Sequence, residues 1–342
     1  MKIWIDILTP KQLLFSEPII EKLSGKHNVL CTSREYHEVS KLAKIRHFDL
    51  IFVGKHGGGD KKSKLKASIE RMGKLSKKIK RFEPDLVISF GSPEAARISF
   101  GLGIKHIMFC DSPHANAVMK LTLPLIQKLL IPYVIPKKEF SKYGIHEKNI
   151  VQYKAIDAAV TMKRKIREDL NSPFKNNNKK NILIRVEEEE AAYTSKSSKI
   201  IPIIQKITKD YKNENVVVLG RYTKQINNLQ KIIGNKVKIV KMSFDGKFLL
   251  NKTDIFIGSG GTMTAESALM GIPTISYNAV PNIVEEFLVK KSLVKRETNP
   301  NKVSNHIKKI FETKNDQNQK RAKKIVKEME DPIEKLIKII KN

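Results

Sequence analysis

The chain has 342 residues, of which 40% are hydrophobic and 29% are charged, a composition that excludes a disordered or collagen-like protein. Its 65 lysines and arginines against 35 acidic residues give a net charge of +30, which predicts anionic partners, although the codon bias of an AT-rich genome would produce part of this excess. The early carboxylate of Asp6 argues against a signal peptide, and the most apolar stretch, 121–136, is too short to span a bilayer. We therefore expect a cytoplasmic protein without a transmembrane helix.

The first half of the chain alternates short apolar runs with helical patterns, which is typical of parallel βαβ units. Five strands are predicted, at residues 3–7, 29–32, 50–54, 86–90 and 106–110. Helices are predicted between them, at residues 12–23, 36–45, 62–82 and 93–100. In a doubly wound sheet of this kind, ligands gather at the carboxyl ends of the strands.

The segment 161–181 contains little that could be buried, and it predicts a linker between a first domain, 1–160, and a second, 182–315. The alternation then restarts, which predicts a second α/β domain. Its strands are expected at residues 182–186, 216–220, 237–240 and 255–258, with helices at 198–211, near 226–233 and from Thr264. Asp331 and Pro332 predict the start of a terminal helix, and the helices of 316–342 are expected to pack back toward the first domain.

The strongest motif is the run Gly-Ser-Gly-Gly-Thr at 258–262, where an apolar strand ends and a helix begins at once. Unpaired backbone N–H groups and the helix dipole then point at one spot, which suits a diphosphate, while Glu266 could accept from ribose hydroxyls. The alternative is an ordinary tight turn with Glu266 as a favourable dipole partner. Two arginines at strand ends could bind phosphate oxygens. The predicted nucleotide-binding residues are Gly258, Ser259, Gly260, Gly261, Thr262, Glu266, Arg185 and Arg221. The acidic run 187–190 is interpreted as a solvated loop, although one of its carboxylates could reach a sugar.

Asp111 and His114 follow the fifth predicted strand and form the best acid/base pair of the chain. A carboxylate three residues from an imidazole can orient it and raise its basicity, as general-base chemistry requires. The alternative is that Asp111 caps the next helix, and for Asp111 taken alone this is the stronger interpretation.

The segment 61–81 carries ten basic residues and one acid, Glu70. Its apolar residues repeat at helical spacing, which predicts a core-facing helix with a basic exterior. These residues are Leu65, Ile69, Met72, Leu75, Ile79 and Phe82. The exterior is either a solvated outer face or a docking surface for anionic lipid headgroups. Nucleic acid fits less well, because no aromatic residues are interleaved with the basic ones.

Several segments together resemble a prokaryotic family catalogued as domain of unknown function 354, itself similar to GT-B glycosyltransferases and UDP-N-acetylglucosamine 2-epimerases. The matching segments are 4–12, 54–58, 92–97, 101–104, 111–115 and 258–266. The resemblance implies two Rossmann-like domains that face each other across a cleft, with the nucleotide held mainly by the second. With the strand ends, it predicts a substrate and acceptor cleft at Thr9, Lys11, Gln12, His56, Gly57, Gly58, Ser92 and Glu94. From the loop 54–59 alone, a mobile loop before a basic helix is an equal alternative.

The resemblance leaves the reaction open. The epimerases usually carry Gly-Asp-Thr after the fourth strand and a histidine-arginine pair after the first strand of the second domain, where this chain has Gly91-Ser92-Pro93 and Ile184-Arg185-Val186. The expected function is a metal-independent glycosyltransferase that needs no cofactor and uses a UDP-sugar as donor. A lipid-linked acceptor would place it at the inner face of the membrane. The alternatives are an epimerase-like enzyme and a non-catalytic nucleotide-sugar-binding protein, and the oligomeric state stays open.

Overall fold

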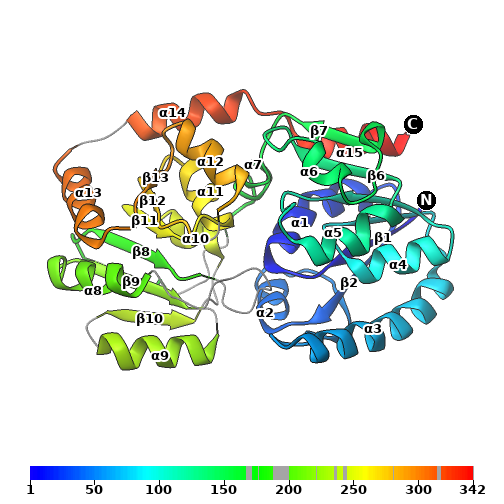
Figure 1. Cartoon of the computed structure of the whole chain (residues 1–342), viewed down its shortest axis with the longest axis horizontal. Helices are drawn as coiled ribbons and strands as arrows, with labels where there is room; N and C mark the ends of the chain where they lie inside the picture. The colour runs from blue at the N-terminus through cyan, green and yellow to red at the C-terminus, as the bar shows by residue number, and fades with distance from the viewer. Residues whose placement is uncertain are drawn as a thin grey trace. The chain divides into compact units, whose positions relative to one another are not determined.

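A computed structural model describes residues 1–166, 172–175, 177–187, 200–220, 222–234, 237–241, 245–279, 281–313 and 317–341. The chain divides into two compact units, one of residues 1–164 with 329–342 and one of residues 165–328. Each unit contains one parallel sheet with helices on its faces (Figure 1). The architecture is thus mixed α/β with two Rossmann-like domains, as the sequence predicts.

The first unit is built on a seven-stranded parallel sheet. Its strands are β1 (Lys2–Ile7), β2 (Asn28–Glu35), β3 (Ile51–Lys55), β4 (Leu86–Ser89), β5 (Lys105–Phe109), β6 (Lys128–Pro132) and β7 (Ile150–Tyr153). They run in the order β3-β2-β1-β4-β5-β6-β7, so the direction of winding reverses between β1 and β4. The carboxyl ends of these two strands are where an open α/β sheet binds ligands.

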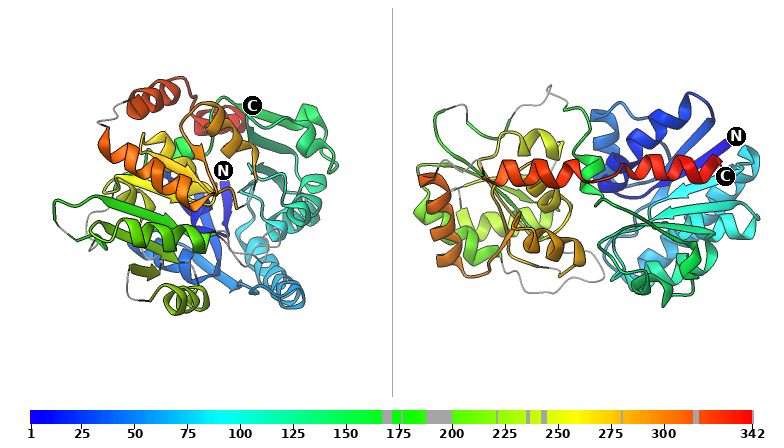
Figure 2. Two further views of the ribbon diagram at one scale, coloured as in Figure 1. Left: turned by 60° about the vertical axis from the view of Figure 1, so that its left-hand side comes forward. Right: turned by 90° about the horizontal axis from the view of Figure 1, so that it is seen from above.

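Three of the helices described in the first unit begin at a side chain that caps them. The helices of this unit are α1 (Pro10–Ser24), α2 (His37–Ile45), α3 (Lys61–Phe82), α4 (Pro93–Gly101), α5 (Asn116–Thr122), α6 (Lys138–Ser141), α7 (Ala158–Thr161) and α15 (Pro332–Lys341). Thr9, Asp60 and Ser92 cap α1, α3 and α4. The carboxylate of Asp331 accepts from the amide of Ile333 at 2.9 Å, and both chain termini lie in this unit (Figure 2).

The core-facing stripe of α3 differs from the sequence prediction. Arg71, Leu75 and Ile79 are buried, whereas Leu65 is 63% exposed and Ile69 is 56% exposed. A stripe centred on Leu75 leaves Ile69 about 120° away around the helix, because each residue turns the helix by about 100°. The assignment of these two aliphatic side chains to the core was therefore wrong, and so was that of Arg71 to a basic exterior.

The second unit is built on a six-stranded parallel sheet in the order β10-β9-β8-β11-β12-β13. The strands are β8 (Asn181–Arg185), β9 (Asn215–Gly220), β10 (Lys238–Lys241), β11 (Ile255–Gly258), β12 (Thr274–Ser276) and β13 (Lys295–Arg296). The helices are α8 (Ile200–Asp210), α9 (Thr223–Ile233), α10 (Gly246–Leu250), α11 (Thr262–Leu269), α12 (Ile283–Lys290), α13 (Pro300–Glu312) and α14 (Gln317–Lys327). Successive residues of β8 enter two different apolar clusters, so this strand is buried on both faces. The winding reverses between β8 and β11.

Candidate functional site

The glycine turn after β11 lies beside the point where the winding of the second sheet reverses, and it leads directly into α11. Gly261 is the N-cap residue of α11, and as a glycine it has no side chain that could cap the helix. The amide of Gly260 donates to the Thr264 hydroxyl at 3.2 Å, and the Asn282 side chain donates to the Gly260 carbonyl at 3.1 Å. These bonds fix the turn from both sides, while the first amides of α11 remain available by position for an anion.

The three glycines of this turn are needed for different reasons. A Cβ on Gly258 would lie 2.5 Å from both the Phe256 ring and the Thr264 hydroxyl, so its role is internal packing. Gly260 has φ +95°, a conformation that side chains rarely adopt. At Gly261 the nearest atom to an added Cβ would be the Ser259 hydroxyl oxygen at 3.9 Å, so this position faces open space. Only Gly261 therefore carries the signature of close approach by a ligand.

Arg185 ends β8, but its guanidinium is directed at the neighbouring strand. Its Nη1 donates to the carbonyl oxygens of Leu219 and Gly220 at 3.3 and 3.2 Å, which satisfies the end of β9. The Tyr277 hydroxyl donates to a carboxylate oxygen of Glu187 at 2.7 Å, and Glu187 is buried. The interpretation of Glu187 as part of a solvated loop was therefore wrong. Arg221 and residues 188–190 lie outside the described residues.

Glu266 lies on α11 and is only 2% exposed. Its carboxylate is next to Gly246, the first residue of α10, where an added Cβ would lie 3.8 Å from Oε2. Its role at a ribose stays a prediction.

A chain of charged groups crosses the carboxyl edge of the first sheet. The Lys11 ammonium pairs with Asp111 and, at 2.8 Å, with Asp157, while the Tyr153 hydroxyl donates to Asp157 at 2.5 Å. Lys11 and Asp111 are each 18% exposed at their side chains and Asp157 is 3% exposed, so a ligand could reach the first two. Burial, with the nearby Asp111, raises the pKa of Asp157 to about 7 despite the opposing effect of Lys11. Sequence analysis missed Asp157 and Tyr153.

Asp111 and His114 lie close enough to influence each other electrostatically. Burial alone would raise the pKa of Asp111, but the Lys11 ammonium lowers it, and the Ser112 hydroxyl donates to Oδ1 at 2.8 Å. Burial lowers the pKa of His114, so its imidazole is neutral near pH 7 and can accept a proton. Helix α5 begins at Asn116 and its N-cap residue is Ala115, so the interpretation of Asp111 as a helix cap was wrong.

Thr9 and Gln12 hold the turn between β1 and α1. The Thr9 hydroxyl caps α1, and the Gln12 amide group accepts from the Leu8 amide and donates to the Phe90 carbonyl, both at 2.6 Å. Gln12 thereby links the carboxyl ends of β1 and β4. The ammonium of Lys11 lies 4.4 Å from the centre of the Phe90 ring.

Ser92 and Glu94 belong to a second, deeper ion cluster centred on Asp6. The Arg71 guanidinium donates two hydrogen bonds to the Asp6 carboxylate, at 2.7 and 3.1 Å, and the Ser92 hydroxyl donates to Asp6 at 2.6 Å. Glu94 accepts from the Ser68 hydroxyl at 2.8 Å, and its other oxygen lies 3.6 Å from Arg71. Asp6 and Ser92 are fully buried, which indicates a scaffold role for this cluster. Sequence analysis did not assign Asp6 or Arg71 a site role.

The glycine loop after β3 is shaped by its contact with α3. A Cβ on Gly54 would lie 2.9 Å from the Arg71 side chain, and one on Gly57 would lie 2.6 Å from the backbone of Lys64. The His56 imidazole accepts from the Gly58 amide at 3.1 Å and stacks on the Tyr36 ring with centroids 4.7 Å apart. Two of the loop's glycines are thus required for helix packing.

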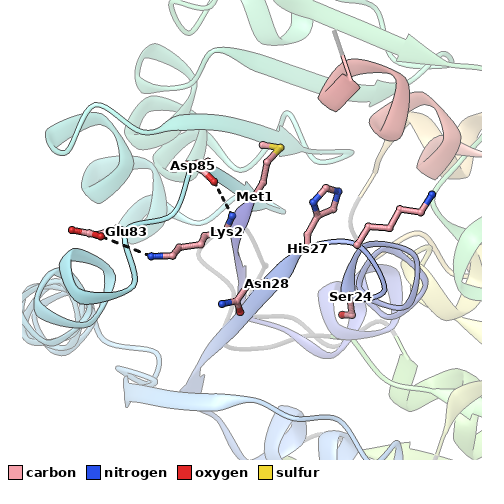
Figure 3. Close-up of a pocket in the computed structure, with 8 residues that line it drawn as sticks. Met1, Lys2, Ser24, His27, Asn28, Glu83 and Asp85 are labelled. Carbon is pink, nitrogen blue, oxygen red and sulfur yellow. Dashed lines mark hydrogen bonds and ion pairs between the residues drawn. The ribbon is translucent and has the colours of Figure 1, made fainter.

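An open hollow of about 880 Å³ lies at the opposite, amino end of the first sheet (Figure 3). The amide of Lys2 donates there to Asp85 at 2.8 Å, and the Lys2 ammonium lies 3.8 Å from Glu83. We assign it no function, because sheets of this type bind ligands at the carboxyl ends of their strands. Among the described residues, no group of three or more potential ligands that could hold a metal ion occurs. None of the helices in these ranges has the length and apolar character needed to cross a membrane.

Comparison with known proteins agrees with this architecture. An uncharacterized protein of Methanocaldococcus jannaschii, MJ0665, is 28% identical over 100% of this chain and 98% of its own length. The UDP-GlcNAc 2-epimerase of Neisseria meningitidis, solved with UDP-GlcNAc bound, matches with a TM-score of 0.73 at 17% identity, covering 100% of both chains. The Streptomyces sp. SF2575 glycosyltransferase SsfS6, complexed with thymidine diphosphate, matches with a TM-score of 0.61 at 11% identity, also over 100% of both chains.

At these identities the likeness to solved structures establishes the fold, which is that of nucleotide-sugar epimerases and GT-B glycosyltransferases. The model of one family, described as "Protein of unknown function (DUF354)", matches residues 1–342. The chain therefore belongs to the DUF354 family.

Proposed function

We propose that the protein is a glycosyltransferase that uses a nucleotide sugar, most simply a UDP-sugar, as its donor. The observation that carries this proposal is the turn at Gly260–Thr262, which joins the reversal point of a parallel sheet to the N-terminus of α11 and faces open space at Gly261. Backbone amides and the positive end of a helix dipole at such a point favour a diphosphate. The solved relatives with bound UDP-GlcNAc and thymidine diphosphate support the same ligand class.

In the proposed reaction, an acceptor hydroxyl attacks the anomeric carbon of the sugar and the bond from that carbon to the diphosphate oxygen breaks. The neutral imidazole of His114 takes the hydroxyl proton, which general-base catalysis requires. Asp111 is the weaker candidate base, because Lys11 stabilises its ionised form. The N-terminus of α11 stabilises the negative charge that develops on the leaving diphosphate, a task that otherwise needs a metal ion or arginine.

A lipid-linked acceptor of cell-surface glycan synthesis is the proposed second substrate. The outer face of α3 exposes the aliphatic side chains of Leu65 and Ile69, and lysines precede and follow these two residues along the helix. Such a face suits an anionic membrane, because apolar residues enter the headgroup boundary while each basic residue adds about 1 kcal/mol of attraction. The chain would thus meet its acceptor as a peripheral protein.

The test is a panel of labelled UDP-sugars incubated with membrane extract and the wild type, His114→Gln or His146→Gln. His146 is an exposed histidine of the same unit and serves as the matched control. We expect transfer by the wild type and the control, and a loss of about 100-fold or more in His114→Gln with UDP affinity retained. Epimerisation of free UDP-N-acetylglucosamine would instead identify an epimerase, and binding without any turnover would identify a nucleotide-sugar-binding protein.

A further inference from the structure

The side chain of Arg34, near the end of β2, is a partly buried cation that makes no hydrogen bond to the described residues. Its Nε is shielded from solvent, and nothing in the described ranges accepts a hydrogen bond from it. Arginine carries five N–H donors in a fixed fork and stays charged at any ordinary pH. Leaving a shielded donor such as this Nε unbonded is unfavourable, so native proteins rarely do so without a reason.

The backbone opposite Arg34 is irregular in a way that supports a special role. In the pairing of β2 with β3, Ser33 faces Phe52 and Glu35 faces Lys55. One residue of β2, Arg34, is therefore opposite two residues of β3, which is a β-bulge. Bulges occur next to active sites, where they redirect a side chain. The Val53 carbonyl in this bulge accepts instead from the Arg71 Nε at 3.0 Å.

The acidic groups that act electrostatically on Arg34 make no hydrogen bond with it. Glu94 and Asp6 both favour the charged form of Arg34, although burial lowers its pKa. Both oxygens of Asp6 already accept hydrogen bonds from Arg71. Glu94 accepts from Ser68, and its second oxygen is 3.6 Å from Arg71. The cluster is balanced in charge, and the Oε2 atom of Glu94, which itself has no hydrogen-bond partner, supports the charge of Arg34 without bonding to its fork.

Arg34 also lies at the edge where a substrate would bind. Tyr36, two residues further along, influences the pKa of Arg34 and stacks on His56, the first residue after β3. The stacked rings are tilted by only 24° and form a flat aromatic surface close to Arg34 along the chain. A cationic fork and a flat aromatic surface at the carboxyl ends of β2 and β3 fit a ligand with an anionic group.

We propose that Arg34 binds an oxyanion, a phosphate or a carboxylate, of the second substrate. That this oxyanion belongs to a substrate rests on the proposed transferase function, whereas the anion site itself does not. The bound oxyanion would accept hydrogen bonds from the guanidinium of Arg34, whose donors have no acceptor in the described part of the protein. The acceptor would therefore be an acidic molecule, recognised by the first unit through Arg34.

The test compares the wild type with Arg34→Gln, Arg34→Lys and Arg97→Gln. Arg97 is exposed on α4 of the same unit, so Arg97→Gln removes the same charge without touching the site. Inorganic phosphate and acetate are titrated by calorimetry and by thermal melting in the presence of saturating UDP. The phosphate arm reports a phosphate site and the acetate arm a carboxylate site, and at least one of these anions should bind.

We expect Arg34→Gln to lose about tenfold or more in affinity for that anion, while Arg97→Gln keeps the affinity of the wild type. Without anions, the Tm of Arg34→Gln should stay close to that of the wild type, because the unbonded Nε is removed together with the favourable charge that Arg34 presents to Glu94 and Asp6. Arg34→Lys, which keeps the charge but not the fork, should fall between them. A Tm several degrees below that of the wild type would overturn the proposal, because Arg34 would then act as a structural partner of Glu94. Anion affinity unchanged in Arg34→Gln, or no anion binding by the wild type, would overturn it as well. UDP binding, measured separately on all four proteins, tests the proposed function alone.

Discussion

Replacing Gly261 with alanine tests the proposed diphosphate turn with little effect on the fold. An added Cβ meets no atom closer than the Ser259 hydroxyl oxygen at 3.9 Å, and the φ of −87° suits any residue. The loss of a flexible glycine from the unfolded chain stabilises the protein by about 0.4–1 kcal/mol, and alanine is a poorer N-cap by a similar amount. The two effects oppose each other, so the free energy of unfolding should change by less than about 1 kcal/mol.

The same methyl group would occupy the space through which a diphosphate approaches the amides at the start of α11. Losing one hydrogen bond to a charged group costs about 1.5–3 kcal/mol, which corresponds to a rise of about 10- to 150-fold in the Kd for UDP. Isothermal calorimetry with UDP measures this rise, and a urea titration of the same samples measures stability. A Gly261→Ala protein of unchanged stability and unchanged UDP affinity would refute the assignment of this turn to the diphosphate.

Two further glycines provide the controls. Gly101→Ala places its Cβ where no atom lies within 4 Å, so UDP affinity should match the wild type while stability rises by about 0.4–1 kcal/mol. Gly258→Ala drives a Cβ to 2.5 Å from Phe256 and Thr264 and should destabilise the protein by about 1–3 kcal/mol. The contrast between Gly258 and Gly261 separates packing from ligand binding within a single turn.

Three other predictions concern stability and membrane binding. Arg71→Met should cost about 3–5 kcal/mol in urea unfolding, because it leaves the buried Asp6 carboxylate without its cation; a loss below about 1 kcal/mol would contradict the scaffold role. The pKa of Asp157 is raised in the folded state, so the stability that its protonated form contributes is lost as pH rises from about 4 to about 7. The Tm of the wild type should therefore fall over this range relative to that of Asp157→Asn, and plots of Tm against pH that run parallel for the two proteins would disprove it. Changing Leu65 and Ile69 to glutamine should reduce sedimentation with anionic liposomes but not the Tm, since both are exposed; equal sedimentation would remove this face as a membrane contact.

Much of the fold could be predicted because hydrophobic periodicity reports local burial. All five strands predicted in the first unit lie within a few residues of β1–β5, since each is an apolar run between turn residues. Strands β6 and β7 were missed. β6, Lys128–Pro132, lies inside a long apolar stretch interrupted by prolines, and such a stretch has no period to separate strand from helix. β7, Ile150–Tyr153, has only four residues, too few for alternation to stand out.

The candidate site was harder to predict, because its key contacts join residues far apart in the chain. Lys11 and Asp157 are 146 positions apart, and nothing in either local pattern connects them. The glycines of 258–261 look alike in the sequence, yet only the structure distinguishes the packing role of Gly258 from the open position at Gly261. Arg71 appeared to belong to a basic helix exterior, because its buried partner, Asp6, is 65 positions away.

The two ion clusters of the first unit differ in what they can do. Arg71 occupies both oxygens of Asp6 and neither residue is accessible, so this pair fixes β1 against α3 and has no group left for chemistry. Lys11 and Asp111 reach the surface at the carboxyl edge, and the cluster that they form with Asp157 changes its net charge from 0 to −1 when Asp157 loses its proton near pH 7. A cluster that changes charge in the physiological range, next to a neutral imidazole, is suited to proton transfer. The reactive edge of the first unit is therefore the Lys11 cluster, and the Asp6 cluster is the scaffold beneath it.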